Sequence, residues 1–393
     1  MLYNKLTHHC LMRIAHVITS LQTGGAEKIL YRNLRAEKQV RQKGTGRQAV
    51  SQAIVISLKD KGPVGESIDD LGVSVYPMEM HERPLRGLLC LFRTMDRFDP
   101  ELVQTWLYHA DLIGGLVARL QGRSVLWSIH SESPKSKRLK KTTRAVAYLS
   151  ALGGRWIPDH VISCSKAAAE THSQFGYPGG KMSIIPNGFD VDKFRPNDER
   201  RIEVRNELNI PREAPVIGMV ARFHPLKDHE NFLEAAVHAQ EEIPDLHFVL
   251  VGKNIRSDVS LFRKYKKNLE EGTLRLLGLR DDIPRLMPSF DVASLSSKTE
   301  AFPMVIGEAM ACGVPCVATN VGDVSYLIGN TGIVVPPRDS GALAEAWCQI
   351  LEMSSEEREA LGRRARERVQ EIFSQEAVLE QYQSIYERLV PAS

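Results

Sequence analysis

The sequence lacks a run of 18 or more apolar residues, so it predicts no segment that crosses a membrane. Its first 21 residues hold only a short apolar stretch, broken by His16, and do not resemble a secretory signal. The six cysteines have no disulfide-framework spacing, which predicts reduced thiols in a cytoplasmic protein. Cys312 and Cys316 stand close together, but nothing supplies further metal ligands, so we predict small buried side chains there.

Motifs of several other protein classes are also missing. Gly24 and Gly25 follow the first predicted strand, but G-x-G-x-x-G and an acidic residue about twenty positions later are absent, which argues against a dehydrogenase. No sheltered Asp-X-Asp metal motif is present, and Asp281 and Asp282 are typical of an acidic helix start. No basic motif interleaved with aromatic residues accompanies the pI of about 8.4, which argues against nucleic-acid binding.

The composition is that of a globular protein with two domains. The 393 residues are 43% apolar and 25% charged, and a chain of this length commonly forms two domains. Residues 1–190 hold 26 Lys and Arg against 16 Asp and Glu, whereas residues 191–393 hold 25 against 32. This asymmetry suggests that the first half meets an anionic partner, although a chance distribution over solvated faces is the alternative.

Short, almost wholly apolar segments alternate with helical segments in both halves of the chain. Examples are "QAIVISL" and "SVLWSIH" in the first half, and "PVIGMVAR" and "HFVLVGK" in the second. This pattern predicts an α/β fold of two doubly wound, parallel-sheet (Rossmann-like) domains facing a cleft, because parallel sheets are covered on both faces. We expect an N-terminal domain at 1–190, a C-terminal domain at 191–375, and a helix at 376–393 that packs back on the N-terminal domain. After residue 354 the pattern predicts that the chain is all helical.

An apolar stretch in the second half carries two acids, Glu300 and Glu308, with seven residues between them. Eight positions along a helix span roughly 12 Å, which fits poorly with the carboxyl separation of glycosidases. Pro303 suits the first turn of a helix, so Ala301 to Val305 would offer free N–H groups to an anion such as a phosphate. The two carboxylates would then accept hydrogen bonds from sugar hydroxyls on either side of a diphosphate, unless they form a chance pair.

Two cations precede a second predicted helix. Arg222 ends a predicted strand and Lys227 follows five residues later. Because a departing diphosphate carries two or three negative charges, its expulsion needs fixed positive charge or a metal ion. Two ordinary surface cations are the alternative.

Taken in order, these segments resemble glycosyltransferase family 4, whose members have the two-domain GT-B architecture. The matching segments, which extend across nearly the whole chain, are "TGGAE" (23–27), "SIH" (128–130), "PNGFD" (186–190), "VARFHPLKD" (220–228), "EAFPMVIGE" (300–308) and "GVPCVAT" (313–319). The resemblance implies a retaining hexosyltransferase that takes a nucleotide sugar, most commonly with uridine as the base. Because Arg222, Lys227 and a helix N-terminus would offset the charge of the leaving group, we expect no metal or other cofactor.

The same resemblance assigns roles to individual residues. Glu300 would contact the donor sugar and Glu308 the ribose, while Arg222 and Lys227 would hold the diphosphate. His130 would face the sugar near its anomeric carbon. The catalytic candidates are therefore His130, Arg222, Lys227 and Glu300, and the donor-binding candidates are Gly24, Gly25, Asn187, Gly252, Pro303, Met304, Val305 and Glu308.

The basic segment 134–144 follows His130 and contains the acceptor and membrane candidates Lys137, Arg138, Lys140 and Lys141. If His130 marks the sugar, this segment lies at the acceptor side. The stretch 35–52 resembles branches that build bacterial surface polysaccharides, whose acceptors have an isoprenoid diphosphate anchor. This implies peripheral contact with the anionic inner face of the cytoplasmic membrane. A solvated charge run is the alternative for this segment. For the whole chain, the alternatives are a nucleotide-sugar epimerase and a non-catalytic nucleotide-sugar-binding protein of the same architecture.

Overall fold

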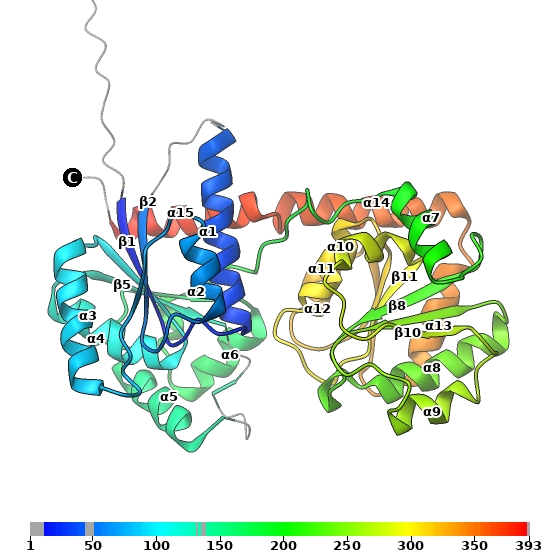
Figure 1. The fold of residues 1–393 in the computed structure, drawn as a ribbon, viewed down its shortest axis with the longest axis horizontal. Coiled ribbons are helices and arrows are strands. Elements are labelled where there is room, and N and C mark those ends of the chain that lie inside the picture. Colours follow the sequence, from blue (N-terminus) through cyan, green and yellow to red (C-terminus); the bar gives the residue numbers. More distant parts are fainter. Residues whose placement is uncertain (1–11, 44–50, 131–132, 135–138, 391–393) are drawn as a thin grey trace, which may run out of the picture. The chain divides into compact units, whose positions relative to one another are not determined.

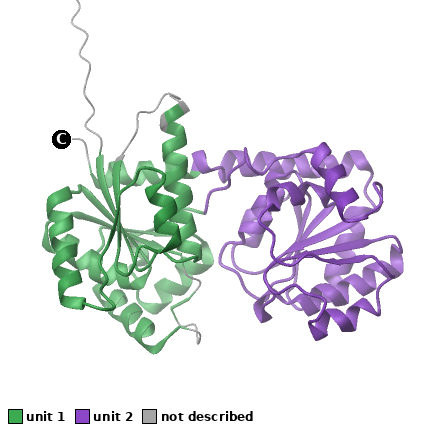
Figure 2. Cartoon of the chain, in the orientation of Figure 1, with its two compact units in different colours: residues 1–186, 378–393 green, residues 187–377 purple. Residues whose placement is uncertain are grey.

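The computed structural model describes residues 12–43, 51–130, 133–134 and 139–390 (Figure 1). They form two compact units (Figure 2). Unit 1 comprises residues 1–186 and 378–393, and unit 2 comprises residues 187–377. Within the described residues, no helix has both the length and the apolar character needed to cross a membrane.

Unit 1 is built on a parallel sheet whose strands follow the order β3-β2-β1-β4-β5-β6-β7. Its central strands are buried on both faces, because helices cover the sheet on each side. The described strands are β1 (Met12–Ile18), β2 (Ser51–Ser57), β3 (Val75–Pro77), β4 (Leu102–Trp106), β5 (Ser124–Ile129), β6 (His160–Ser163) and β7 (Met182–Ile184).

The helices of unit 1 lie in two layers. One hydrophobic cluster joins Val103 and Val125 of the sheet to α3, α4 and α5, and another joins Leu102 and Leu126 to α15 on the opposite face. The α15 hydroxyl of Tyr386 also donates to Gln104 Oε1 at 2.6 Å. The described helices are α1 (Gly25–Lys43), α2 (Gly62–Asp69), α3 (Pro84–Phe98), η1 (Ala110–Gly114), α4 (Gly115–Leu120), α5 (Lys141–Gly153), α6 (Lys166–Phe175), η2 (Gly179–Lys181) and α15 (Gln375–Leu389).

Unit 2 repeats this plan with a second parallel sheet, in the order β10-β9-β8-β11-β12-β13. Its described strands are β8 (Val216–Val220), β9 (His247–Val251), β10 (Leu274–Leu276), β11 (Val292–Leu295), β12 (Cys316–Thr319) and β13 (Gly332–Val335). Its described helices are α7 (Asp198–Glu207), η3 (Pro225–Lys227), α8 (His229–Glu242), α9 (Ser260–Lys266), α10 (Ile283–Leu286), η4 (Met287–Ser289), α11 (Met304–Ala311), α12 (Val324–Ile328), α13 (Ser340–Leu351) and α14 (Ser355–Ile372).

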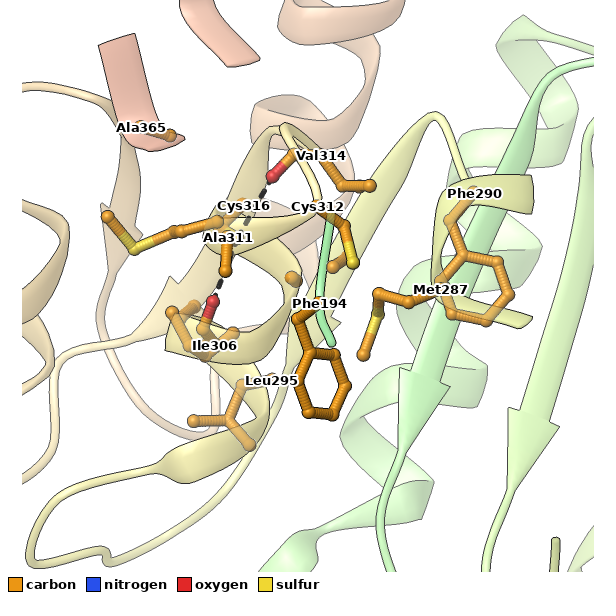
Figure 3. Close-up of a cluster of buried hydrophobic side chains, with 14 of the residues drawn as sticks. Phe194, Met287, Phe290, Leu295, Ile306, Ala311, Cys312, Val314, Cys316 and Ala365 are labelled. Carbon is orange, nitrogen blue, oxygen red and sulfur yellow. Dashed lines mark hydrogen bonds between the residues drawn. The ribbon is translucent and has the colours of Figure 1, made fainter. Parts of the chain in front are cut away.

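The hydrophobic cluster beneath α11 contains both cysteines that the sequence places close together (Figure 3). Cys312 and Cys316 are buried beside Phe194 and Ile306, and burial raises the pKa of the Cys312 thiol to about 12. Cys316 Sγ lies 3.4 Å from the carbonyl oxygen of Val314. The prediction that these two cysteines are buried core side chains is confirmed.

After residue 354 the described chain is helical as predicted, with one short break. Helix α14 ends at Ile372, and α15 begins at Gln375. Between them the chain pairs with Phe189, whose N–H donates to Phe373 O at 2.8 Å and whose carbonyl accepts from Gln375 N at 3.0 Å. Phe373 is fully buried, so its packing and these two bonds replace the helical hydrogen bonds lost at the break.

Candidate functional site

The candidate donor site of unit 2 lies where β8 and β11 end, at the carboxyl edge of the sheet. Lys227, in η3 after β8, forms an ion pair with Glu300, in the loop after β11. Ser297 Oγ donates to the same Glu300 oxygen at 2.6 Å. The side chains of Lys227 and Glu300 are 23% and 14% exposed, so they are partly sheltered but still accessible to a ligand. The structure therefore brings together two of the predicted catalytic residues.

A second ion pair fixes the backbone of this site. Lys298 Nζ contacts Asp228 Oδ1 at 2.8 Å, and Ser296 Oγ donates to the carbonyl oxygens of Lys227 and Asp228 at 2.9 and 3.0 Å. Asp228 has a left-handed backbone with φ of 47°, which is unfavourable for a residue other than glycine. Its contacts with the strand-end residues hold this conformation and thereby orient Lys227. No site role was predicted from the sequence for Ser296, Ser297, Asp228 or Lys298.

The loop that carries Glu300 rests on a glycine. Gly322 has φ of 55°, and a Cβ there would overlap the carbonyl oxygen of Glu300. The N–H of the next residue, Asp323, donates to Ala301 O at 3.0 Å. The close backbone approach that glycine permits therefore helps to fix the position of the loop that carries Glu300.

Helix α11 follows directly and carries Glu308. It begins at Met304, and Pro303 is its N-cap residue, so the expected place of Pro303 in the first turn is wrong by one position. Met304 and Val305 are both partly exposed in the first turn. Glu308 lies about one turn into the helix and is partly exposed. The free backbone N–H groups of this first turn point out of the N-terminal end of the helix, which is the end that anions prefer.

Arg222 lies two residues beyond β8 and is exposed. Its guanidinium makes no ion pair or hydrogen bond with another described residue, so it is a cation available to a ligand. Gly252 follows β9 with φ of 152°, and a Cβ there would overlap the carbonyl oxygen of Ala221. Gly252 thus allows the loop after β9 to approach the backbone that presents Arg222. Asn187, the first residue of unit 2, is buried.

The remaining candidates belong to unit 1, also at the carboxyl edge of its sheet. His130 follows β5, and its ring stacks on Trp106 with centroids 4.8 Å apart and an interplanar angle of 12°. Neither ring nitrogen of His130 has a hydrogen-bond partner among the described residues. Burial lowers the pKa of His130 to about 4, so the imidazole is neutral near pH 7. Such a neutral ring can donate one hydrogen bond to a ligand and accept another from it.

Gly24 and Gly25 lie at the start of α1, after β1. A Cβ at Gly24 would overlap the carboxylate of Glu27, to which Ser20 Oγ donates at 3.2 Å. A Cβ at Gly25 would meet nothing within 4 Å, so this position opens to space that a ligand could fill.

A buried polar network at the end of β4 was not predicted. Leu107, directly after β4, has a strained φ of 73°, and its carbonyl accepts from Asp111 N at 3.0 Å. Thr105 Oγ1 donates to Asp111 Oδ1 at 2.6 Å, and burial raises the pKa of Asp111 to about 8. The hydroxyl oxygen of Tyr108, the residue after Leu107, lies 2.9 Å from His172 Nε2. Strained backbone of this kind clusters at functional sites, but no sequence pattern reveals it.

Of the acceptor candidates, Lys140 and Lys141 are exposed at the start of α5. Lys137 and Arg138 lie outside the described residues. Lys141 and Arg144 line an open pocket of about 410 Å³ together with Tyr148 and Phe175.

No described group of three or more His, Cys, Asp or Glu is arranged to hold a metal ion.

Two family models match the chain. "Glycosyltransferase Family 4" matches residues 47–193, and "Glycosyl transferases group 1" matches residues 214–353. One curated relative is the Escherichia coli UDP-Gal:alpha-D-GlcNAc-diphosphoundecaprenol alpha-1,3-galactosyltransferase, 27% identical over 74% of this chain and 78% of its own length. Another is the N-acetyl-alpha-D-glucosaminyl L-malate synthase of Bacillus anthracis, 31% identical over 55% of this chain and 56% of its own length.

Solved structures share the fold. Anabaena HepE in complex with UDP has a TM-score of 0.80 at 22% identity, covering 96% of this chain and all of that one. WaaG, a glycosyltransferase involved in lipopolysaccharide biosynthesis, has a TM-score of 0.68 at 14% identity, covering 97% of this chain and all of that one. These similarities confirm the predicted fold class of two Rossmann-like, parallel-sheet domains.

Proposed function

Because this chain belongs to glycosyltransferase family 4, we propose that it transfers a sugar, with retention of anomeric configuration, from a UDP-sugar to a lipid-linked glycan acceptor. The observation that carries the proposal is the Lys227–Glu300 pair, held by Ser297 at the carboxyl edge of the unit 2 sheet. Open parallel sheets bind ligands at this edge. In this pair the Glu300 carboxylate would accept hydrogen bonds from sugar hydroxyls, and the neighbouring Lys227 ammonium would bind a phosphate.

The donor site would work through charge and position. Arg222, exposed and without a described partner, and the N–H groups at the start of α11 would hold the diphosphate. Lys227 would turn toward the leaving phosphate as its charge develops, while Glu300 holds the sugar. Neutral His130, whose two ring nitrogens have no described partner, would hydrogen-bond the sugar. Gly25 would allow backbone approach to the donor.

The choice of donor and acceptor rests on relatives. The E. coli relative is named for transfer from UDP-Gal to a GlcNAc-diphosphoundecaprenol, and HepE has been solved with UDP and with UDP-glucose. A lipid-linked acceptor in surface polysaccharide synthesis would place the protein at the inner face of the cytoplasmic membrane. The basic residues Lys137, Arg138, Lys140 and Lys141 would favour that anionic surface by about 1 kcal/mol each.

A panel of nucleotide sugars tests the proposal without an acceptor. We expect slow hydrolysis of one UDP-sugar, seen as release of UDP. Conversion of a nucleotide sugar into its epimer, with the nucleotide still attached, would instead identify an epimerase. Binding of the donor without any turnover would identify a non-catalytic binding protein.

Catalysis is expected not to require a divalent ion. Arg222, Lys227 and the α11 N-terminus would together offset the charge of the departing diphosphate, which is the role a metal would otherwise fill. We expect EDTA to leave the initial rate of UDP release unchanged. Loss of activity that added Mg²⁺ or Mn²⁺ restores would contradict this account of the leaving group.

Replacing Glu308 by alanine is expected to weaken donor binding by about 10- to 100-fold, the typical value of a hydrogen bond to a charged group. A ribose contact is nearly the same in the ground and transition states, so kcat should change little. Titration of the inactive donor analogue UDP and steady-state kinetics measure the two effects. Glu345→Ala, which removes an exposed glutamate of α13, is the matched control. Unchanged donor affinity in Glu308→Ala would overturn the ribose assignment.

A further inference from the structure

Exposed apolar side chains gather on one helical layer of unit 1. The described residues include thirteen exposed large hydrophobic side chains, of which nine lie on α3, α4 and α5, and a tenth, Trp156, follows α5. These helices cover the same face of the sheet, and α15 covers the other. A soluble surface normally scatters such residues singly, whereas a gathered set marks an interaction site.

Helix α3 carries the clearest stripe. Leu85, Leu88, Leu89 and Phe92 follow the i, i+3, i+4, i+7 spacing of one helix face, and their exposures are 79%, 42%, 60% and 44%. The core-facing residues of α3 form a different face that includes Leu91, which is fully buried. The exposed stripe is therefore an additional apolar face that the core of unit 1 does not explain.

The stripe continues onto the neighbouring helices. Gln121, at the end of α4, donates to the carbonyl oxygen of Phe92 at 2.9 Å, which places α4 beside α3. Leu120 of α4 is 80% exposed. Arg119 donates to the carbonyl oxygen of Ile157 at 2.7 Å, so Trp156, 73% exposed, lies next to α4.

Helix α5 adds Tyr148, Leu149 and Leu152, all about half exposed. Its first turns also carry exposed Lys141 and Arg144. We define the outer face of α3, α4 and α5, together with Trp156, as the apolar face of unit 1.

Cations flank the apolar face. Arg86, Arg93 and Arg97 lie along one side of the α3 stripe, all exposed and none in an ion pair with a described residue. Lys141 and Arg144 are likewise in no ion pair with a described residue. Long cationic side chains beside apolar residues are typical of proteins that lie in a membrane interface, where apolar groups enter the acyl boundary and the cations meet phosphates.

The charges also decide between possible occupants. In a symmetric dimer the same patch would meet itself, so these unpaired cations would face one another and repel. An anionic bilayer offers both an apolar layer and complementary charge. We propose that the apolar face of unit 1 is a docking surface that inserts its leucines and Trp156 into the interface of an anionic lipid bilayer.

The proposed docking surface extends the proposed function. It rests on that function in one respect, because docking serves to reach a lipid-linked acceptor. Helices α3 and α5 follow β3 and β5 in the chain, so their first residues lie on the side of the unit 1 sheet where the parallel strands end. Leu85 and Lys141, at these helix starts, therefore lie at the same edge as His130. Docking through this surface would bring that edge close to the phosphates of the bilayer.

Trp156 provides a direct measurement. Trp106, Trp127 and Trp347 are buried, so an emission shift on membrane contact would come chiefly from Trp156. We expect vesicles of phosphatidylcholine and phosphatidylglycerol to shift the full-length protein's emission to shorter wavelength, and brominated lipid to quench it. Trp156→Phe should abolish the signal while sedimentation with the vesicles persists.

The triple variant Leu85→Ser, Leu89→Ser, Phe92→Ser tests the apolar contribution. Because each lost apolar side chain is worth about a tenfold change in partitioning, we expect vesicle affinity to fall at least on the order of 100-fold, also at high salt. Leu279→Ser, which removes a 76% exposed leucine of unit 2, is the matched control and should bind like the wild type. Lys140→Gln with Lys141→Gln should weaken binding only to vesicles that contain phosphatidylglycerol, and less at high salt.

UDP-sugar hydrolysis without acceptor is measured on the same proteins, which separates the two proposals. Hydrolysis by the triple variant at the wild-type rate, with vesicle binding lost, would support the docking surface. Wild-type hydrolysis without any vesicle binding would overturn the docking surface alone, and vesicle binding without turnover of any nucleotide sugar would count against the proposed function alone. Dimerisation that the triple variant abolishes, with no binding to vesicles, would show instead that copies of this chain meet at the apolar face.

Discussion

Replacing Lys227 by alanine is expected to lower kcat for the accepted UDP-sugar by about 10²–10³-fold, the usual cost of losing one group that stabilises developing charge. Lys227 is positioned by its ion pair with Glu300 and by the backbone conformation of Asp228, so its ammonium needs little reorganisation to reach the leaving phosphate. The variant also leaves Glu300 without its described cation, while Ser297 still donates to it. The expected loss is in turnover, measured as UDP release at saturating donor.

Two further variants make this test specific. Arg222→Ala should lower the rate by a similar factor, because its guanidinium is exposed and has no described partner before the diphosphate binds. Arg256→Ala, which removes an exposed arginine paired with Asp258 on the loop after β9, is the control and should retain the wild-type rate. A Lys227→Ala enzyme with wild-type kcat would show that the Lys227–Glu300 pair serves only to support the loop.

Acidification is expected to destabilise unit 1 strongly. Burial lowers the pKa of His16 to about 3 and those of His130 and His172 to about 4, from an ordinary value of 6.5. Below pH 6.5 the unfolded chain therefore binds protons that the folded unit does not, so the free energy of unfolding decreases as the pH is lowered. Asp111 acts in the opposite direction, because its raised pKa of about 8 makes the folded unit bind a proton first and gain stability as pH falls. For these four groups the net difference approaches two protons near pH 5, which corresponds to about 2.7 kcal/mol per pH unit there. The pKa values of His109 and His160 are also lowered by burial, so these two histidines act in the same direction.

Urea unfolding at several pH values measures this slope, followed by the emission of the buried residues Trp106 and Trp127. His16→Gln should reduce the slope by about 1.4 kcal/mol per pH unit, since one fewer buried histidine is protonated on unfolding. His81→Gln, which removes an exposed histidine, should leave the slope unchanged. A free energy of unfolding that stays constant between pH 6 and 4.5 would show that these histidines are not held neutral.

The sequence predicted the parts of the fold that depend on local pattern. Apolar strand segments such as those of β5 and β9 are buried on both faces, and their period and length identify them without any knowledge of tertiary contacts. The hydrogen bonds to Phe189 at the break before α15 could not be predicted, because Phe189 is distant in the sequence. Local helix preference was overridden there by tertiary packing.

The same distinction applies to the candidate site. Glu300 and Lys227 were selected from spacing and chemistry, but their ion pair depends on two loops brought together by neighbouring strands β8 and β11. The left-handed backbone of Asp228 is held by tertiary contacts and has no sequence signal. The apolar stripe of α3 has the spacing of an ordinary core-facing helix, so only its exposure in the structure distinguishes it.

The most direct test of the proposed function is the product formed from the accepted UDP-sugar and a polyprenyl-diphosphate-linked sugar, analysed by NMR. We expect one equivalent of free UDP for each new glycosidic bond, and an anomeric configuration in that bond equal to the configuration of the sugar in the donor. A bond of inverted configuration would contradict the retaining mechanism. Recovery of the donor unchanged, or as an epimer still attached to UDP, would contradict glycosyl transfer itself.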